Sequence, residues 1–116
     1  MSIPTIYHNP RCSKSRQTLE LITENGHEPE VIEYLKTRPD AKTIKELLKQ
    51  LGITPRKLIR TKEAVFDELK LGGAELTDEQ LINAMVENPI LIERPIVVRG
   101  NKARMGRPPE QVLEIL

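Results

Sequence analysis

The sequence predicts an α/β fold in which a mixed sheet of about four strands is interrupted by a block of helices. Three observations support this prediction. A strand, a helix and a second strand follow one another within residues 3–34. Residues 43–89 then show only helical patterns. Two short strands joined by a tight turn, and a last helix, complete the chain, so a βαβ half and a ββα half flank the helical insertion.

The βαβ half begins with a β-branched and aromatic run, residues 3–7, and an Asn-Pro turn signal at residues 9–10 ends this strand. Apolar residues then recur at helical spacing through Ile22, and Gly26 marks the end of that helix. Residues 28–34 predict the second strand. Two strands joined so closely through a helix form a right-handed parallel unit.

The helical block carries a helix-start signal at each of its threonines. The predicted N-caps are Thr43, Thr54, Thr61 and Thr77. Glu46 and Gln80 lie three residues after two of these threonines, which is the capping-box spacing. Helix-ending signals follow at Gly52, at residues 72–73 and at residues 88–89, so we expect four successive helices.

The ββα half follows the block. Residues 96–99 predict a strand, residues 100–101 a Gly-Asn hairpin turn, and residues 102–105 the return strand. The last helix is predicted to place three apolar residues on one face: Val112, Leu113 and Leu116. The order βαβ, helical insertion, ββα is that of a thioredoxin-like fold.

Composition and charge indicate which partners to expect. The chain has 116 residues, which suits a single domain over residues 1–116. Its 18 basic and 17 acidic residues leave a net charge of +1, so no overall field attracts nucleic acid or a membrane. One cysteine cannot form an intramolecular disulfide, and residues 1–4 lead into a strand without a signal peptide. We therefore expect a cytoplasmic monomer with no bound cofactor or metal.

The single cysteine, Cys12, lies at the predicted turn between the first strand and the first helix. The unpaired N–H groups and the dipole at a helix N-terminus favour a thiolate over a thiol. An unperturbed thiol, with a pKa of about 8.5, is only a few per cent ionised at neutral pH, so a lowered pKa decides whether the sulfur is reactive. Nearby basic residues (His8, Arg11, Lys14 and Arg16) add positive charge. A buried structural cysteine is the alternative, but these polar neighbours disfavour it.

Three arginines lie at the edges of predicted elements, each directly before a helix cap or a proline: Arg60, Arg94 and Arg107. A guanidinium group is planar and always charged, and it can bind an oxyanion through two hydrogen bonds. A cluster of such groups near a thiolate suits a tetrahedral oxyanion substrate. Taken singly, each arginine reads as an ordinary surface charge.

Residues 6–16 (Ile-Tyr-His-Asn-Pro-Arg-Cys-Ser-Lys-Ser-Arg) closely resemble the active-site loop of the glutaredoxin-linked arsenate reductases, the ArsC family. Residues 58–61, 93–97 and 106–110 resemble the family's other three signatures in the same order. The resemblance spans essentially the whole chain. It implies a thioredoxin-like fold with a helical insertion, a cis-proline at Pro95, and a site in which three arginines converge on Cys12: Arg60, Arg94 and Arg107.

The resemblance also implies a mechanism. The Cys12 thiolate attacks the arsenic of arsenate while the arginines hold the oxyanion. Glutathione, as co-substrate, attacks the adduct, and glutaredoxin resolves the mixed disulfide with release of arsenite, a reaction of arsenic detoxification. His8 is implied to help keep the thiolate ionised; the alternative is a strand-end histidine bound by backbone. For Ser15 the alternatives are a hydrogen bond to the sulfur or a place in the first helical turn.

Two other functions stay open. One is a glutathione-dependent thiol oxidoreductase acting on another substrate. Arg11, Ser13 and Lys14 replace small residues typical of the family, and the added positive charge favours an anion without indicating which one. The other is a binding role like that of the Spx-type regulators, which share this fold and bind RNA polymerase. Their Cys-x-x-Cys switch is excluded here because the second position is Ser15.

Overall fold

The computed structural model describes residues 3–73 and 75–116, which form two compact units. The sheet unit contains the described residues up to 37 together with residues 94–116, and the helical unit contains residues 38–93. In sequence, the helical unit is inserted between the two halves of the sheet unit, as predicted. Residues 1–2, which were expected to lead directly into the first strand, lie outside the described residues. Among those residues, no helix has the length and apolar character needed to cross a lipid bilayer.

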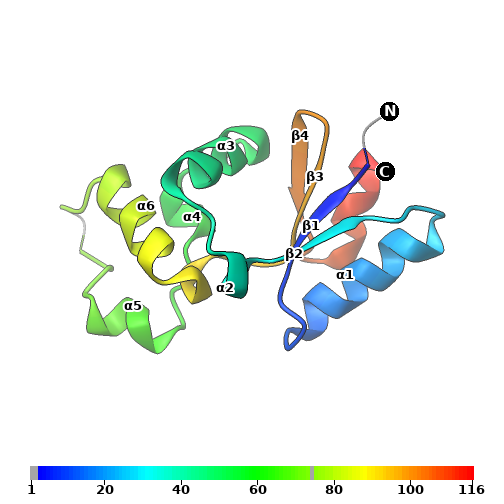
Figure 1. The fold of residues 1–116 in the computed structure, drawn as a ribbon. Coiled ribbons are helices and arrows are strands. Elements are labelled where there is room, and N and C mark those ends of the chain that lie inside the picture. The colour runs from blue at the N-terminus through cyan, green and yellow to red at the C-terminus, as the bar shows by residue number, and fades with distance from the viewer. Residues whose placement is uncertain (1–2, 74) are drawn as a thin grey trace. The chain divides into compact units, whose positions relative to one another are not determined.

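The sheet unit is a four-stranded mixed sheet with helices. Its elements are β1 (Thr5–His8), α1 (Ser13–Glu24), β2 (Glu30–Glu33), α2 (Tyr34–Thr37), β3 (Ile96–Arg99), β4 (Lys102–Met105) and the 3₁₀ helix η2 (Pro109–Ile115). The strand order is β2-β1-β3-β4; β1 and β2 are parallel, and the other pairs are antiparallel (Figure 1). This topology confirms the predicted thioredoxin-like fold. The short helix α2 was not predicted.

The core of the sheet unit lies between the sheet and two helices. Ile6 of β1 and Val97 of β3 are cross-strand partners, so their side chains share one face of the sheet. Both are fully buried in a cluster with Ile22 of α1 and Val112 of η2. Helices α1 and η2 therefore pack on the same face (Figure 1). This packing holds α1, whose N-cap residue is Cys12, against the sheet.

The last helix differs from the prediction. It is a 3₁₀ helix, with about three residues per turn, so residues three apart share a face. Pro109 and Val112 are buried accordingly, and Ile115 packs against the core cluster. Leu113 is 42% exposed, so its predicted place on the apolar face is wrong.

The helical unit contains four α-helices and one 3₁₀ helix within its described residues. They are α3 (Ala41–Leu51), α4 (Pro55–Leu58), α5 (Ala64–Glu68), α6 (Asp78–Glu87) and η1 (Pro89–Leu91). The predicted capping box of Thr77 and Gln80 is present at the start of α6. Thr54 occupies the N-cap position of α4 without a side-chain cap, and Gly52 ends α3 with φ 70°.

Two of the predicted helix starts are wrong. Helix α3 is capped by Asp40, whose carboxylate accepts a hydrogen bond of 2.8 Å from the Thr43 N–H. Aspartate is among the strongest N-cap residues, and it begins the helix one turn before the predicted Thr43. Helix α5 has Glu63, not Thr61, at its N-cap, because residues 61–63 form a turn first.

The Arg94–Pro95 peptide bond is cis, as the family resemblance indicated. The Arg107–Pro108 bond is also cis, which was not predicted. Both bonds directly follow arginines predicted to belong to the site.

Gly106 lies in close contact with Pro95 and Thr18, and its N–H donates to the Pro95 carbonyl at 2.9 Å. A Cβ at this position would come within 2.7 Å of Pro95 Cγ and would also collide with Thr18 Oγ1. Thr18 is fully buried and the proline ring is rigid, so neither can move aside. We expect Gly106→Ala to lower the free energy of unfolding by about 1–3 kcal/mol in urea denaturation.

The matched control is Gly72→Ala. Among the described residues, a Cβ at Gly72 meets only the Phe66 ring, at 3.7 Å, which is ordinary van der Waals contact. Its unfolding free energy should change by less than about 1 kcal/mol. Equal losses in the two variants would contradict the close packing assigned to Gly106.

Candidate active site

Cys12 is the N-cap residue of α1, with the extended backbone geometry (φ −91°, ψ 122°) that precedes a helix. Its N–H donates to the Asn9 carbonyl at 3.0 Å, and its own carbonyl accepts the Arg16 N–H at 3.0 Å. The residue is partly exposed, so it is not a core cysteine. The structure therefore confirms that the thiol lies at a strand-to-helix turn, at the start of a helix.

The pKa of the Cys12 thiol is lowered from its ordinary value. Partial burial raises the pKa, but the N–H groups of Ser15 and Lys14, a hydrogen bond from the Arg94 side chain and the charge of Arg107 together outweigh burial. The sulfur makes no capping hydrogen bond of ordinary geometry, so these N–H groups act on it mainly as nearby dipoles. The net effect favours the thiolate.

Arg107 contacts the sulfur directly. Its Nη2 donates to Cys12 Sγ at 3.6 Å, while its Nε donates to the Arg94 carbonyl at 2.7 Å. The backbone bond orients the guanidinium with one edge toward the sulfur. Arg94 itself is only 8% exposed, and its side chain hydrogen-bonds the same sulfur. Two of the three predicted arginines therefore meet at Cys12.

Arg60 lies in the helical unit and binds two carboxylates there. Its Nε pairs with Glu63 at 3.0 Å and its Nη1 with Glu93 at 2.5 Å. Burial lowers the pKa of Arg60, but the two carboxylates raise it by more than burial lowers it. The pKa of Arg60 is therefore above its ordinary value. Because Arg60 and Cys12 belong to different units, the predicted approach of Arg60 to the sulfur stays a prediction.

His8 is bound by a side chain and not by backbone. Its Nδ1 lies 2.6 Å from Ser15 Oγ, and the residue is 6% exposed. The Ser15 hydroxyl also accepts the Asn9 N–H at 3.0 Å, and it can donate its own hydrogen to His8 Nδ1 when the neutral imidazole is protonated on Nε2. Ser15 therefore acts on the sulfur through its backbone N–H, and its hydroxyl belongs to the His8 contact.

The pKa of His8 is lowered from the ordinary histidine value of 6.5. Burial lowers it most, Glu33 raises it and Arg16 lowers it. His8 is thus mainly neutral at pH 7, so it influences the loop through its hydrogen bond to Ser15 and not through a positive charge. This is a different route from the charge effect that the family resemblance suggests.

We expect His8 to titrate below 6.5 in an NMR pH titration, with the His27→Gln variant used to assign its resonances. As the pH falls, His8 of the unfolded chain takes up its proton at a higher pH than His8 of the folded chain does. The stability contributed by neutral His8 is therefore complete above pH 6.5 and declines as the pH falls toward the folded-state pKa. Titration at or above 6.5 would contradict the buried, neutral arrangement.

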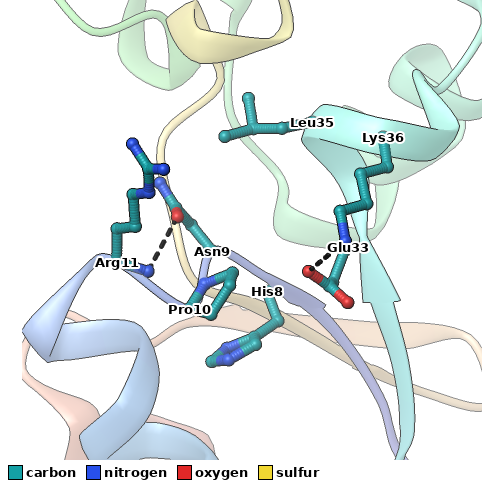
Figure 2. A pocket seen from close by; sticks show the side chains of 7 residues that line it. All are labelled: His8, Asn9, Pro10, Arg11, Glu33, Leu35 and Lys36. Carbon is teal, nitrogen blue, oxygen red and sulfur yellow. Dashed lines mark hydrogen bonds and ion pairs between the residues drawn. The ribbon is translucent and has the colours of Figure 1, made fainter.

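A pocket of about 160 Å³ lies beside the cysteine turn, at the C-terminal ends of β1 and β2 (Figure 2). Residues 8–11 line one side, and Glu33, Leu35 and Lys36 line the other. Lys36 Nζ lies 3.6 Å from Glu33 Oε1, so part of the lining charge is already paired. Cys12 does not line this pocket. The pocket is therefore lined by the turn that precedes Cys12 and not by Cys12 itself.

Asn9 is the residue whose role the sequence did not reveal beyond a turn signal. It is buried, and its polar groups bond Arg11, Cys12 and Ser15. The Asn-Pro pair predicted a turn but not these partners. Within the described residues, no group of three or more His, Cys, Asp or Glu side chains is placed to hold a metal ion.

This arrangement suits nucleophilic attack on an anion. A sulfur with a lowered pKa supplies the nucleophile, and guanidinium groups from Arg94 and Arg107 lie against it. Donors fixed before the reaction can stabilise negative charge on a tetrahedral oxyanion at little cost in reorganisation.

Comparisons with known proteins agree on one family. The family model described as the ArsC family matches residues 7–115. An Escherichia coli K12 protein described as uncharacterized protein YfgD is 62% identical over 112 residues, which cover 96% of this chain and 94% of that protein. An arsenate reductase of Yersinia enterocolitica is 50% identical over 116 residues, covering 100% of this chain and 82% of that protein. A solved structure described as an arsenate reductase from Vibrio cholerae has a TM-score of 0.97 and 53% identity, covering 99% and 98% of the two chains.

Proposed function

The chain belongs to the ArsC family, and from this membership and the geometry at Cys12 we propose that it is an oxidoreductase that reduces arsenate to arsenite. The observation that carries the proposal is the convergence of Arg94 and Arg107 on a sulfur with a lowered pKa. Arsenate is a tetrahedral oxyanion, which guanidinium groups bind well.

The first step is attack by the Cys12 thiolate on arsenic. A sulfur–arsenic bond forms, and one arsenate oxygen leaves as water after taking up protons from solvent. Arg107 and Arg94 hold the remaining oxygens and offset the negative charge that builds on them. The lowered pKa supplies the thiolate at neutral pH without a separate base.

The electrons come from external thiols. We propose that glutathione attacks the adduct and displaces a second oxygen as water, so that arsenic bridges Cys12 and glutathione. A glutaredoxin thiolate then attacks the glutathione sulfur, which forms a mixed disulfide and leaves the sulfur–arsenic electron pair on arsenic. Hydrolysis of the remaining bond to Cys12 releases arsenite. The single cysteine of the chain supports external resolving thiols, and we place the reaction in the reducing cytoplasm.

His8 and Ser15 have supporting roles in this proposal. The Ser15 N–H helps to stabilise the thiolate, while the bond between Ser15 Oγ and His8 Nδ1 keeps the first turn of α1 in place. Arg60 is proposed as a third substrate-binding arginine, on the family resemblance alone. Its test is Arg60→Ala, for which we expect weaker arsenate binding.

A coupled assay tests the proposal. Purified protein, glutathione, glutaredoxin, glutathione reductase and NADPH are mixed with arsenate, and NADPH oxidation is followed. A parallel reaction replaces arsenate with a glutathione mixed-disulfide substrate, which tests the alternative thiol oxidoreductase. We expect oxidation that depends on both the protein and arsenate. Activity on the mixed disulfide alone would overturn the assignment of arsenate as substrate.

A further inference from the structure

Asn9 makes three hydrogen bonds within the turn that carries Cys12. Its carbonyl accepts the Cys12 N–H at 3.0 Å. Its side-chain Oδ1 accepts the Arg11 N–H at 3.0 Å, as Figure 2 shows. Its own N–H donates to Ser15 Oγ at 3.0 Å. The residue is 4% exposed. One buried asparagine thus connects the end of β1 to both sides of the cysteine.

The first two bonds form nested turns. The bond from the Cys12 N–H to the Asn9 carbonyl closes a four-residue turn whose second position is Pro10, where a fixed φ is favoured. The bond from the Arg11 N–H to Asn9 Oδ1 closes an Asx turn inside it, a geometry available to Asn and Asp and more weakly to Ser. The side chain of Asn9 therefore holds the turn independently of its backbone.

The orientation of Cys12 depends on this turn. The Cys12 N–H is fixed on one side, by Asn9, and the Cys12 carbonyl on the other, by the N–H of Arg16 in α1. Rotation of the turn would move the sulfur away from Arg107 Nη2, now at 3.6 Å, and from the N–H groups at the start of α1. We propose that Asn9 is a positioning residue, whose side chain fixes the turn so that the Cys12 sulfur faces the helix start and Arg107.

The test compares alkylation of Cys12 by iodoacetamide across pH in the native protein and three variants. Asn9→Ala removes the Oδ1 acceptor, and Asn9→Ser keeps a short acceptor oxygen. Asn101→Ala is the matched control. It removes an exposed asparagine from the β3–β4 turn, which the pairing of Tyr7 with Ile96 and Thr5 with Val98 places at the other end of the sheet from Cys12.

We expect the inflection for Asn9→Ala to lie about one pH unit above that of the native protein, which lowers the alkylation rate about tenfold at pH values below both inflections. Asn9→Ser should recover most of the native profile, and Asn101→Ala should keep all of it. A merely structural role would lower the melting temperature of Asn9→Ala but leave the inflection of the folded protein unchanged. An unchanged inflection, or no recovery in Asn9→Ser, would overturn the proposal.

A second measurement covers the case in which Asn9→Ala does not fold. Hydrogen exchange in the native protein should show the amides of Arg11 and Cys12 protected, because both donate to Asn9. Exchange of both at the rate of an unstructured peptide would overturn the proposal. The role of Asn9 in turnover rests on the proposed function, but alkylation and exchange need neither arsenate nor glutathione. Their failure is therefore distinct from a failure of arsenate reduction.

Discussion

Replacing Cys12 by serine is expected to reduce arsenate turnover to the rate without enzyme. Serine is about the same size and is a favourable residue at the N-cap position that Cys12 occupies, but its hydroxyl is not ionised at neutral pH and forms no sulfur–arsenic bond. The chain has no second cysteine that could take over. The coupled assay should show a loss of at least about a thousandfold, as expected when the only nucleophile is removed.

The control is Ser13→Ala, which removes an exposed hydroxyl from the next residue of the same helix. This variant should keep turnover within about twofold of native, since it removes neither the thiol nor an arginine. Circular dichroism should show all three proteins equally folded. Arsenate reduction at the native rate by Cys12→Ser would end the proposed mechanism.

Replacing Arg107 by alanine is expected to lower kcat/KM for arsenate by about 10²–10³-fold, the usual cost of one lost donor to a developing oxyanion. The change removes the group 3.6 Å from the sulfur and also the positive charge that lowers the pKa of Cys12. Arg107→Lys separates these effects. It keeps the charge but cannot donate both to the Arg94 carbonyl and to the sulfur in the same planar geometry.

We therefore expect Arg107→Lys to keep an alkylation profile close to native while kcat/KM still falls at least about tenfold. The control is Arg104→Ala on β4, whose guanidinium pairs with Glu114 at the surface at 2.9 Å. Loss of that surface pair should change activity little. If Arg104→Ala and Arg107→Ala lost the same activity, the specific role of Arg107 would be refuted.

Local signals in the sequence predicted much of the fold. The Asn-Pro pair, the first helix and the lone cysteine lie so close together that the strand-to-helix turn at Cys12 could be recognised from spacing alone. The same holds for the hairpin over residues 96–105 and for the Thr77 capping box. Each depends on residues only a few positions apart, where backbone preferences act directly.

Two details could not be predicted: which of two possible residues caps a helix, and which face of the last helix is exposed. Asp40 and Thr43 both fit a helix start, and the sequence does not show that the earlier residue caps α3. Leu113 faces solvent because the last helix has a 3₁₀ repeat, in which Pro109, Val112 and Ile115 share a face.

The site depends on long-range contacts in the same way. Position at the edge of an element indicated Arg94 and Arg107, but only the folded sheet unit shows Arg107 bonding both the Arg94 carbonyl and the cysteine sulfur. The basic neighbours of Cys12 in sequence were expected to supply the positive charge. The cations that lower its pKa are instead these two distant arginines.

The most direct test of the account is the pH dependence of Cys12 alkylation in the native protein. Because its pKa is lowered, the folded thiol loses its proton at a lower pH than the unfolded thiol does. The folded state therefore becomes more stable as the pH increases from the folded-state pKa of Cys12 to the pKa of the unfolded thiol. The alkylation rate should show an inflection well below the value of about 8.5 for a free thiol. An inflection at or above about 8.5 would show that neither the helix start nor the two arginines stabilise a thiolate.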